Sequence, residues 1–334
     1  TPEGRKAAAG LVANKQYRFI TIETSPSRTP LDDLEPEATR GWMVADKQSA
    51  LAMSAAAFYL GRDLVKEAGV PIGIVDLDMG HHFAGAWLSE EGVDLAQKRP
   101  GPGTGDVHSA RKLLPAEYEA WDKRIAGYQY QFWDRRVGYL TKGTPLGPKP
   151  EGSSEPLPGL PPEQRAFSPS VCYNAVIHPL QGLAVKGMLL QLGNDYPYYE
   201  YKMLPRKDRN VHIYPILKQA SRMTPHVLPE AVDDLRRSLG EPELPLAWIM
   251  PPGSDNYKHA NHNKEVRELQ RRVRETSKGV DLILPGTKHI RSSGQPADEA
   301  LLADRCRKWV MGTFYGDKTP VSGPIFDRVE YGEG

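Results

Sequence analysis

The sequence predicts an α/β fold in which helices cover both faces of a parallel sheet, and three observations support this. Stretches with helical periodicity alternate with short apolar strands along the chain, which is the pattern of a parallel sheet. The clearest strand, 183–192, is apolar except at three positions and ends in the turn formers Gly193, Asn194 and Asp195. The length of 334 residues suits one large domain with long loop insertions.

The first part of the chain supplies two strands with a helix between them. Residues 17–23 alternate apolar and polar side chains as a strand does, and the proline-rich stretch 25–40 is typical of a loop. Apolar residues recur at helical spacing through 49–68, and Gly69 is a stop signal. A second strand is predicted at 72–77, so that strand, helix and strand form one unit.

The rest of the chain continues the alternation. We expect a Gly/Pro-rich loop at 90–105, and then a long helix at 116–139, where aromatic side chains recur near helical spacing. Further strands are predicted at 244–250 and 280–284, and further helices at 263–278 and 296–314.

One domain with two flanking segments accounts for this pattern. We assign 1–16 to an N-terminal arm, 17–316 to the domain and 317–334 to a C-terminal tail. A proline-rich insertion at 143–166 is predicted to be a covering loop, and an arm that grips a partner chain is the alternative.

Composition limits the classes of partner. Lys plus Arg is 43 and Asp plus Glu is 42, so no overall field attracts nucleic acid, and no apolar stretch reaches the length of a membrane span. The chain starts at Thr1 without an initiator Met, and we expect a mature or truncated chain. The two cysteines, Cys172 and Cys306, are predicted to be buried thiols.

Several segments resemble one known family. The sequence YNAVIHPL at 173–180, followed by Lys186, Gly187 and an apolar run, is similar to the core of the sialate O-acetylesterase family, a branch of the SGNH hydrolases. The segments GVPIGI at 69–74 and AWLS at 86–89 also resemble that family. The resemblance implies a three-layer, flavodoxin-like α/β/α fold, carbohydrate ester hydrolysis and an extracellular or periplasmic location.

The catalytic blocks of this family are poorly matched. Its nucleophile lies in a Gly-Gln-Ser-Asn block, and no such block precedes 17–23. In the second block, His81 replaces a glycine, and Gly85 replaces an acidic residue. A histidine side chain there would fill the space that lets the backbone approach an oxyanion.

The remaining two blocks are also altered. Gln-Gly-Glu-Ser-Asn becomes 192–196, LGNDY, and Gln295 stands where the family has its catalytic histidine. Glutamine has no group that titrates near neutral pH, so it cannot act as a general base. His289 is the local substitute, and with Asn194 and Asp195 it is the catalytic candidate if the chain is active.

We therefore expect a non-catalytic relative of the sialate O-acetylesterases that acts as a structural or accessory subunit or as a carbohydrate-binding module. Partners would be other protein subunits, with carbohydrate as a further candidate. The alternative is an active carbohydrate O-acetylesterase whose nucleophile lies upstream of Thr1 or in a shifted loop. The candidate contact residues are His81, His82, Asn194, Asp195, Tyr196, Tyr198 and Tyr199.

Two pairs of histidines are candidate metal ligands. The adjacent pair His81 and His82, and the pair His259 and His262, could supply ligands, but adjacent histidines do not easily chelate one ion. We therefore predict no metal and no cofactor. His178 belongs to the YNAVIHPL segment, and we interpret it as a hydrogen-bonded histidine that fixes a loop.

Overall fold

The computed structural model describes residues 14–77, 79, 82, 84–99, 116, 119, 168–191, 214–251, 257–285 and 299–320. The strands are β1 Asn14–Ile22, β2 Met43–Ala45, β3 Ile72–Leu77, β4 Met188–Leu190, β5 Leu246–Ile249 and β6 Val280–Ile283. The helices are α2 Ala55–Ala68, α3 Glu90–Lys98, α7 Tyr214–Leu239, α8 Tyr257–Thr276 and α9 Glu299–Tyr315. Short helical turns are η1 Ser49–Ala52, η2 Ala84–Trp87 and the π-helical η4 Tyr173–Ile177.

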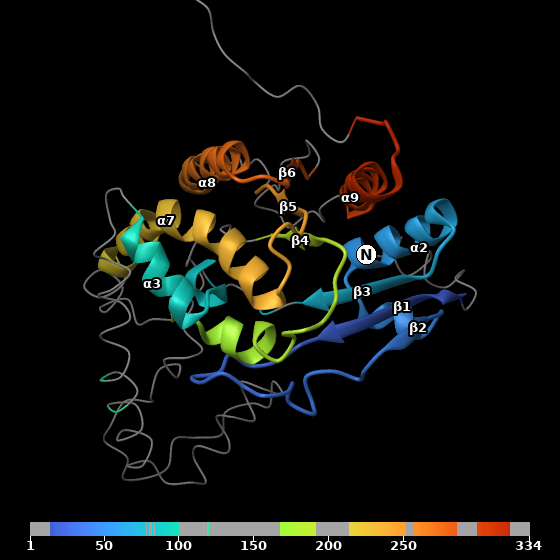
Figure 1. Cartoon of the computed structure of the whole chain (residues 1–334), viewed down its shortest axis with the longest axis horizontal. Helices are drawn as coiled ribbons and strands as arrows, with labels where there is room; N and C mark the ends of the chain where they lie inside the picture. Colours follow the sequence, from blue (N-terminus) through green and yellow to red (C-terminus); the bar gives the residue numbers. More distant parts are fainter. Residues whose placement is uncertain are drawn as a thin grey trace, which may run out of the picture.

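These strands form two three-stranded sheets, ordered β2-β1-β3 and β4-β5-β6. β1 and β3 run parallel, in register from Tyr17 opposite Ile72 to Ile22 opposite Leu77, and β4, β5 and β6 are all parallel. β2 is antiparallel to β1, which the sequence did not predict. Figure 1 shows the two sheets with β3 and β4 as their facing edges.

Helices cover both faces of this arrangement (Figure 1). α2 and α9 pack together on one face, where Leu64, Ile249 and Trp309 belong to one buried cluster. α3, α7 and α8 cover the other face, where Val232 and Trp248 belong to a second cluster. The predicted three-layer α/β/α architecture is therefore confirmed.

The predicted helix 49–68 is divided in two by a cap. The Ser54 hydroxyl accepts a hydrogen bond from Ala57 N at 3.2 Å, which starts α2 at Ala55 and leaves η1 as a separate turn. Asp76 of β3 accepts from the Ser54 N–H at 2.7 Å and so ties the cap to the sheet. Gly69 ends α2 in the left-handed region with φ 65°, as its role as stop signal requires.

The prediction of a loop at 90–105 was wrong for its first nine residues, which form α3. The Ser89 hydroxyl accepts from Gly92 N at 2.9 Å, and Glu90 and Glu91 lie in the first turn, where the helix dipole favours negative charge. This N-terminal signal outweighs the helix-weakening Gly92. The loop assignment followed glycine and proline content and overlooked the cap.

Other boundaries also differ from prediction. The central strand predicted at 183–192 is reduced to β4, and β1 begins at Asn14, inside the segment assigned to an arm. α7 was not predicted, because Pro225 and Pro229 lie inside it. Apart from residues 116 and 119, the predicted helix 116–139 lies outside the described residues, as do the insertion 143–166 and most of the tail.

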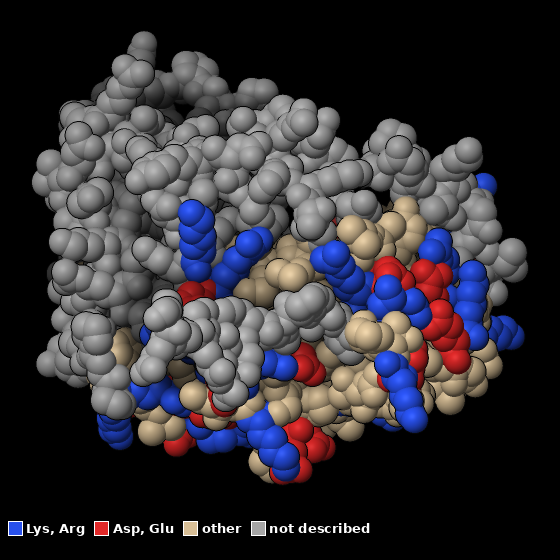
Figure 2. Space-filling view, turned by 90° about the horizontal axis from the view of Figure 1, so that it is seen from above, with Lys and Arg blue, Asp and Glu red and all other residues tan. Residues whose placement is uncertain are grey.

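Charges of both signs are interspersed on the face formed by α8, α9 and α2 (Figure 2). Arg271 pairs with Glu268 at 2.8 Å on α8, and Arg307 pairs with Asp304 at 2.6 Å on α9. Hydrogen bonds from Arg271 and Arg272 lower the pKa of Glu268 to about 2. Among the described residues of this face, no large field of one sign forms.

Candidate functional site

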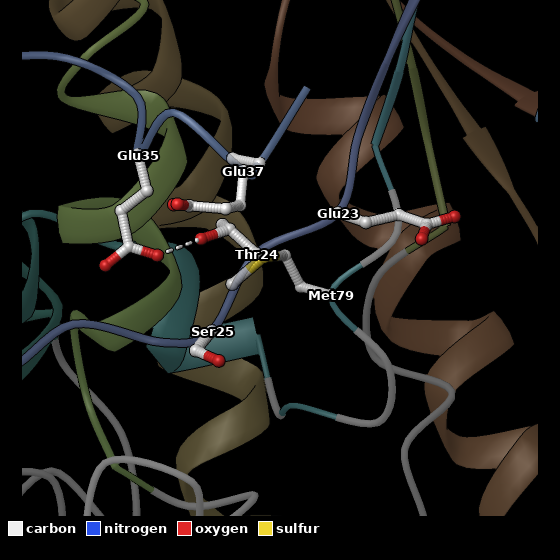
Figure 3. Close-up of a pocket in the computed structure, with 7 residues that line it drawn as sticks. Glu23, Thr24, Ser25, Glu35, Glu37 and Met79 are labelled. Atoms are coloured by element: carbon white, nitrogen blue, oxygen red, sulfur yellow. Dashed lines mark hydrogen bonds between the residues drawn. The ribbon is translucent and has the colours of Figure 1, made fainter. Parts of the chain in front are cut away.

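The carboxyl ends of β1 and β3 open onto a hollow of about 600 Å³. Ligands gather at this edge of an open parallel sheet, because the loops that follow neighbouring strands converge there. The lining residues are Glu23, Thr24, Ser25, Glu35, Glu37, Ala38 and Met79 (Figure 3). The hollow is therefore built from the segment that directly follows β1 and from the residue two positions after β3.

The hollow is acidic and rich in hydrogen-bond acceptors. The Thr24 hydroxyl donates to Glu35 Oε2 at 3.0 Å, and the Glu37 carboxylate lies on the same side, whereas Glu23 points the other way (Figure 3). The three glutamates and Ser25 are exposed to solvent. Exposed carboxylates beside hydroxyl groups can accept hydrogen bonds from a ligand that carries several hydroxyls.

Residues of η4 and the turn after it hold the loop that forms this hollow. Asn174 Nδ2 donates to the carbonyls of Ser27 and Arg28 at 3.3 and 3.2 Å. His178 Nδ1 lies 2.8 Å from the carbonyl oxygen of Leu31, and since a carbonyl can only accept, Nδ1–H is the donor. The prediction that His178 is a hydrogen-bonded histidine that fixes a loop is confirmed.

A buried histidine, His82, follows Met79 by three residues and is not one of the residues that line the hollow. His82 is 8% exposed, and its Nδ1 donates to the carbonyl of Met79 at 2.8 Å. Of the candidate contact residues, His82 is the one that lies among the described residues. The buried ring is tied to Met79 and is not displayed to solvent.

The other candidates from sequence are not placed. His81, Asn194, Asp195, Tyr196, Tyr198, Tyr199 and His289 lie outside the described residues. The sequence prediction missed the acidic hollow, although the acidic stretch 25–40 was recognised as a loop. Its position directly after a parallel strand was the signal that could have identified it.

Two serines near the hollow differ in accessibility. Ser25 is exposed, and within the described part of the chain no histidine is hydrogen-bonded to its hydroxyl. Ser170 is 6% exposed, has φ 65°, and its N–H donates to the carbonyl of Gly85 at 3.1 Å. A serine becomes a strong nucleophile only beside a base, and among the described residues no histidine is hydrogen-bonded to either hydroxyl.

Neither a metal site nor a membrane-spanning helix is found in the described ranges. No three His, Cys, Asp or Glu side chains in those ranges are arranged to hold a metal ion. None of the helices that the structure describes combines the length and apolarity needed to cross a bilayer.

Comparison with known proteins places the fold. No protein-family model matches the chain, and no curated protein matches it. A solved structure described as a novel carbohydrate acetylesterase from Xanthomonas citri superposes with a TM-score of 0.59 at 17% identity. The match covers 98% of this chain and 55% of that chain, so the protein spans about half of the length of its structural neighbour. At this identity the likeness shows the fold alone, and the chain therefore shares the α/β fold of that structure.

Proposed function

We propose that this chain is an esterase-like protein without hydrolytic activity of its own, and that it acts as an accessory subunit or carbohydrate-binding module outside the cytoplasm. The observation that carries the proposal is the composition of the hollow. Among the described residues, its lining offers carboxylates, two hydroxyls and a thioether, but no imidazole. Ester hydrolysis by a serine requires a base that removes the hydroxyl proton.

The sequence supports the same proposal at the positions where the family has its catalytic blocks. Gln295 replaces the histidine, His81 replaces a glycine of the oxyanion loop, and Gly85 replaces an acidic residue. Loss of one triad member already costs several orders of magnitude in rate, and combined losses leave little beyond binding.

A carbohydrate is the ligand class that suits the hollow. Glu35 and Glu37 present acceptors on one side, and Thr24 adds a hydroxyl. Sugar hydroxyls donate readily to carboxylates, and such charge-assisted hydrogen bonds are stronger than neutral ones. The acetylesterase that shares this fold is described as acting on carbohydrates, which supports the same class.

An esterase assay tests the absence of activity. The purified chain is incubated with an aryl acetate and with an O-acetylated oligosaccharide, beside Ser25→Ala and His289→Ala variants. We expect the same background release of acetate from all three proteins. Turnover by the parent chain that either substitution abolishes would refute the proposal.

A titration tests the binding role. Isothermal titration with O-acetylated and de-acetylated oligosaccharides should give saturable binding, and Glu37→Gln should weaken it roughly tenfold, because one charge-assisted hydrogen bond is lost. Glu241→Gln, on the exposed loop after α7, is the matched control and should leave the affinity unchanged. Equal affinities for Glu37→Gln and the parent chain would exclude the hollow as the binding site.

An active carbohydrate O-acetylesterase is the second candidate, because β3 and β4 do not pair and the structural neighbour is much longer. The nucleophile would then lie upstream of Thr1 or in a shifted loop of this chain. A serine-directed fluorophosphonate should label a serine in the natural full-length product. Absence of any labelled serine would eliminate this candidate.

A further inference from the structure

The loop 23–38, which connects β1 to β2 and carries most of the lining of the hollow, is closed at its base. The Glu23 N–H donates to the carbonyl of Ala38 at 2.9 Å, and a bridge between Ile22 and Thr39 lies next to that bond. A compact surface loop whose ends meet in this way is an Ω-loop, a class that often carries function. The geometry of the hollow therefore depends on what holds the rest of this loop.

η4 holds the loop through four hydrogen bonds. The Ser27 N–H donates to the carbonyl of Val171 at 3.0 Å, and the Leu31 N–H donates to the carbonyl of Asn174 at 3.0 Å. Asn174 Nδ2 donates to the carbonyls of Ser27 and Arg28 at 3.3 and 3.2 Å. Asn174 thus contacts the loop with both its backbone and its side chain.

The π-helical form of η4 makes the backbone contact possible. In an α-helix the His178 N–H would donate to the carbonyl four residues earlier, which is that of Asn174. In η4 it donates instead to the carbonyl of Tyr173, five residues earlier, at 2.9 Å. The Asn174 carbonyl is thereby left to accept from the loop. Single π-helical turns are frequent at functional sites, and here the turn serves to hold a loop.

The side-chain contact depends on the amide nitrogen. Because carbonyls only accept hydrogen bonds, the atom that faces Ser27 and Arg28 must be Nδ2. Asn174 is 4% exposed, and within the described part of the chain its Oδ1 has no hydrogen-bond partner. The side chain therefore holds the loop through its donors alone.

We propose that Asn174 is a positioning residue for the hollow: it fixes the loop from behind, so that Glu35 and Glu37 keep their places before a ligand arrives. Asn174 is not among the residues that line the hollow, so it acts without touching the ligand. Acceptors that are already ordered lose less conformational entropy on binding, which strengthens the affinity. The inference rests on the proposed binding role of the hollow.

An Asn174→Asp variant tests the role of the donors, since it keeps the size of the side chain and replaces Nδ2 by an acceptor. At pH 7, hydrogen exchange followed by mass spectrometry should show the amides of Ser27 and Leu31 exchanging roughly tenfold faster or more than in the parent chain. The amides of β5 should be unchanged. As the pH falls toward about 4, the protonated carboxyl regains one donor, so part of the protection should return, after correction for intrinsic exchange.

Binding is measured on the same variants with the oligosaccharides of the titration above. At pH 7, Asn174→Asp should weaken the affinity about tenfold, because the loop must then be ordered at the cost of binding energy. Asn174→Ala removes the donors without adding a charge, and it should show the same losses with no recovery at low pH.

Gln181→Glu is the matched control. It adds the same charge in the turn after η4, but Gln181 is exposed and its Nε2 bonds to the Tyr173 hydroxyl at 2.9 Å rather than to the loop. Both the protection of the loop and the affinity should equal those of the parent chain.

Three results would overturn the positioning role. The first is unchanged protection of Ser27 and Leu31 in both Asn174 variants. The second is a loosened loop with unchanged affinity while Glu37→Gln still weakens binding, which would leave the proposed function standing. The third is an equal rise of exchange in β5, which would mean that Asn174 supports the whole fold. Absence of sugar binding by the parent chain and by Gln181→Glu alike would instead refute the proposed function.

Discussion

Tyr17 is a single side chain that joins β1 to α2. It is 1% exposed, and its hydroxyl donates to the carbonyl of Ala57 at 2.8 Å. Its ring lies against Gly61, where a Cβ would stand 2.1 Å from a ring carbon, so only glycine permits this approach. Burial raises the pKa of Tyr17, and the negative charge of Asp76 raises it further.

The raised pKa predicts a loss of stability in alkali. The unfolded tyrosine releases its proton near pH 10 while the folded one keeps it, so the stabilisation is complete below pH 10 and is lost as the pH rises. The free energy of unfolding should fall by up to about 1.4 kcal/mol per pH unit through this group above pH 10. Urea unfolding from pH 8 to 11 measures this slope.

A Tyr17→Phe variant separates this group from the lysines that titrate in the same range. The variant should lose about 1 kcal/mol at neutral pH, because one buried hydrogen bond is removed. Its alkaline slope should be shallower than that of the parent chain. Parallel slopes for the two proteins would contradict the assignment to Tyr17.

Some single residues were predictable from sequence and others were not. Cys172 and Cys306 are buried free thiols as predicted, and His178 fixes a loop as predicted, because their neighbours along the chain reveal their environment. The grouping of Glu35 and Glu37 with Thr24 was not predicted. Their proximity arises from the return of the loop, which the bonds from η4 determine.

At the scale of elements, α3 and α7 are joined by a buried carboxylate. Asp234 of α7 accepts from the Ser89 N–H at 2.6 Å and from its hydroxyl at 2.7 Å, and its side chain is 2% exposed. Arg237 balances the charge at 3.0 Å. Gly92 allows the approach, since a Cβ there would lie 2.5 Å from the carboxyl carbon of Asp234.

Removal of Asp234 should therefore loosen the start of α3. Asp234→Ala is expected to lower the free energy of unfolding on the order of 3 kcal/mol, because the half-buried donors of Ser89 and the cation of Arg237 lose their buried acceptor. Asp233→Ala is the matched control. Its carboxylate is 46% exposed and pairs with Arg99, so its loss should cost less than about 1 kcal/mol. Equal losses in chemical denaturation would contradict this role.

Elements with strong local signals were predicted well. β1, β3, β5, β6, α2 and α9 all overlap their predicted ranges, because apolar periodicity and stop signals identify them. α7 was missed, since its prolines argue locally against a helix, and packing against α3 and α8 outweighs that tendency. β4 is shorter than predicted because an apolar run does not by itself define where strand pairing ends.

At the scale of the whole molecule, the two cysteines lie in buried clusters on opposite faces of the sheets. Cys172 belongs to the cluster beneath α7, and Cys306 belongs to the cluster beneath α2 and α9. Burial raises the pKa of the Cys306 thiol to about 12. Both clusters include side chains of both sheets, so neither layer can unfold without exposing the other.

We expect the two thiols to become reactive together. In single-cysteine variants Cys172→Ala and Cys306→Ala, the remaining thiol should resist a thiol reagent at pH 8 and react over the same range of urea concentration. Pulsed labelling measures the two midpoints. Well-separated midpoints would show that the layers unfold independently.

Within the described residues, β3 and β4 each have one backbone edge without a partner strand, and these edges also matter while the protein is being made. The mature helical layers shield these edges from other molecules, but a nascent chain exposes them before its helices have docked. Unsatisfied strand edges are templates for aggregation. The refolding yield of the 334-residue chain should therefore decline as protein concentration rises. For the same reason, exposed strand edges during synthesis would make folding in the cell depend on chaperones.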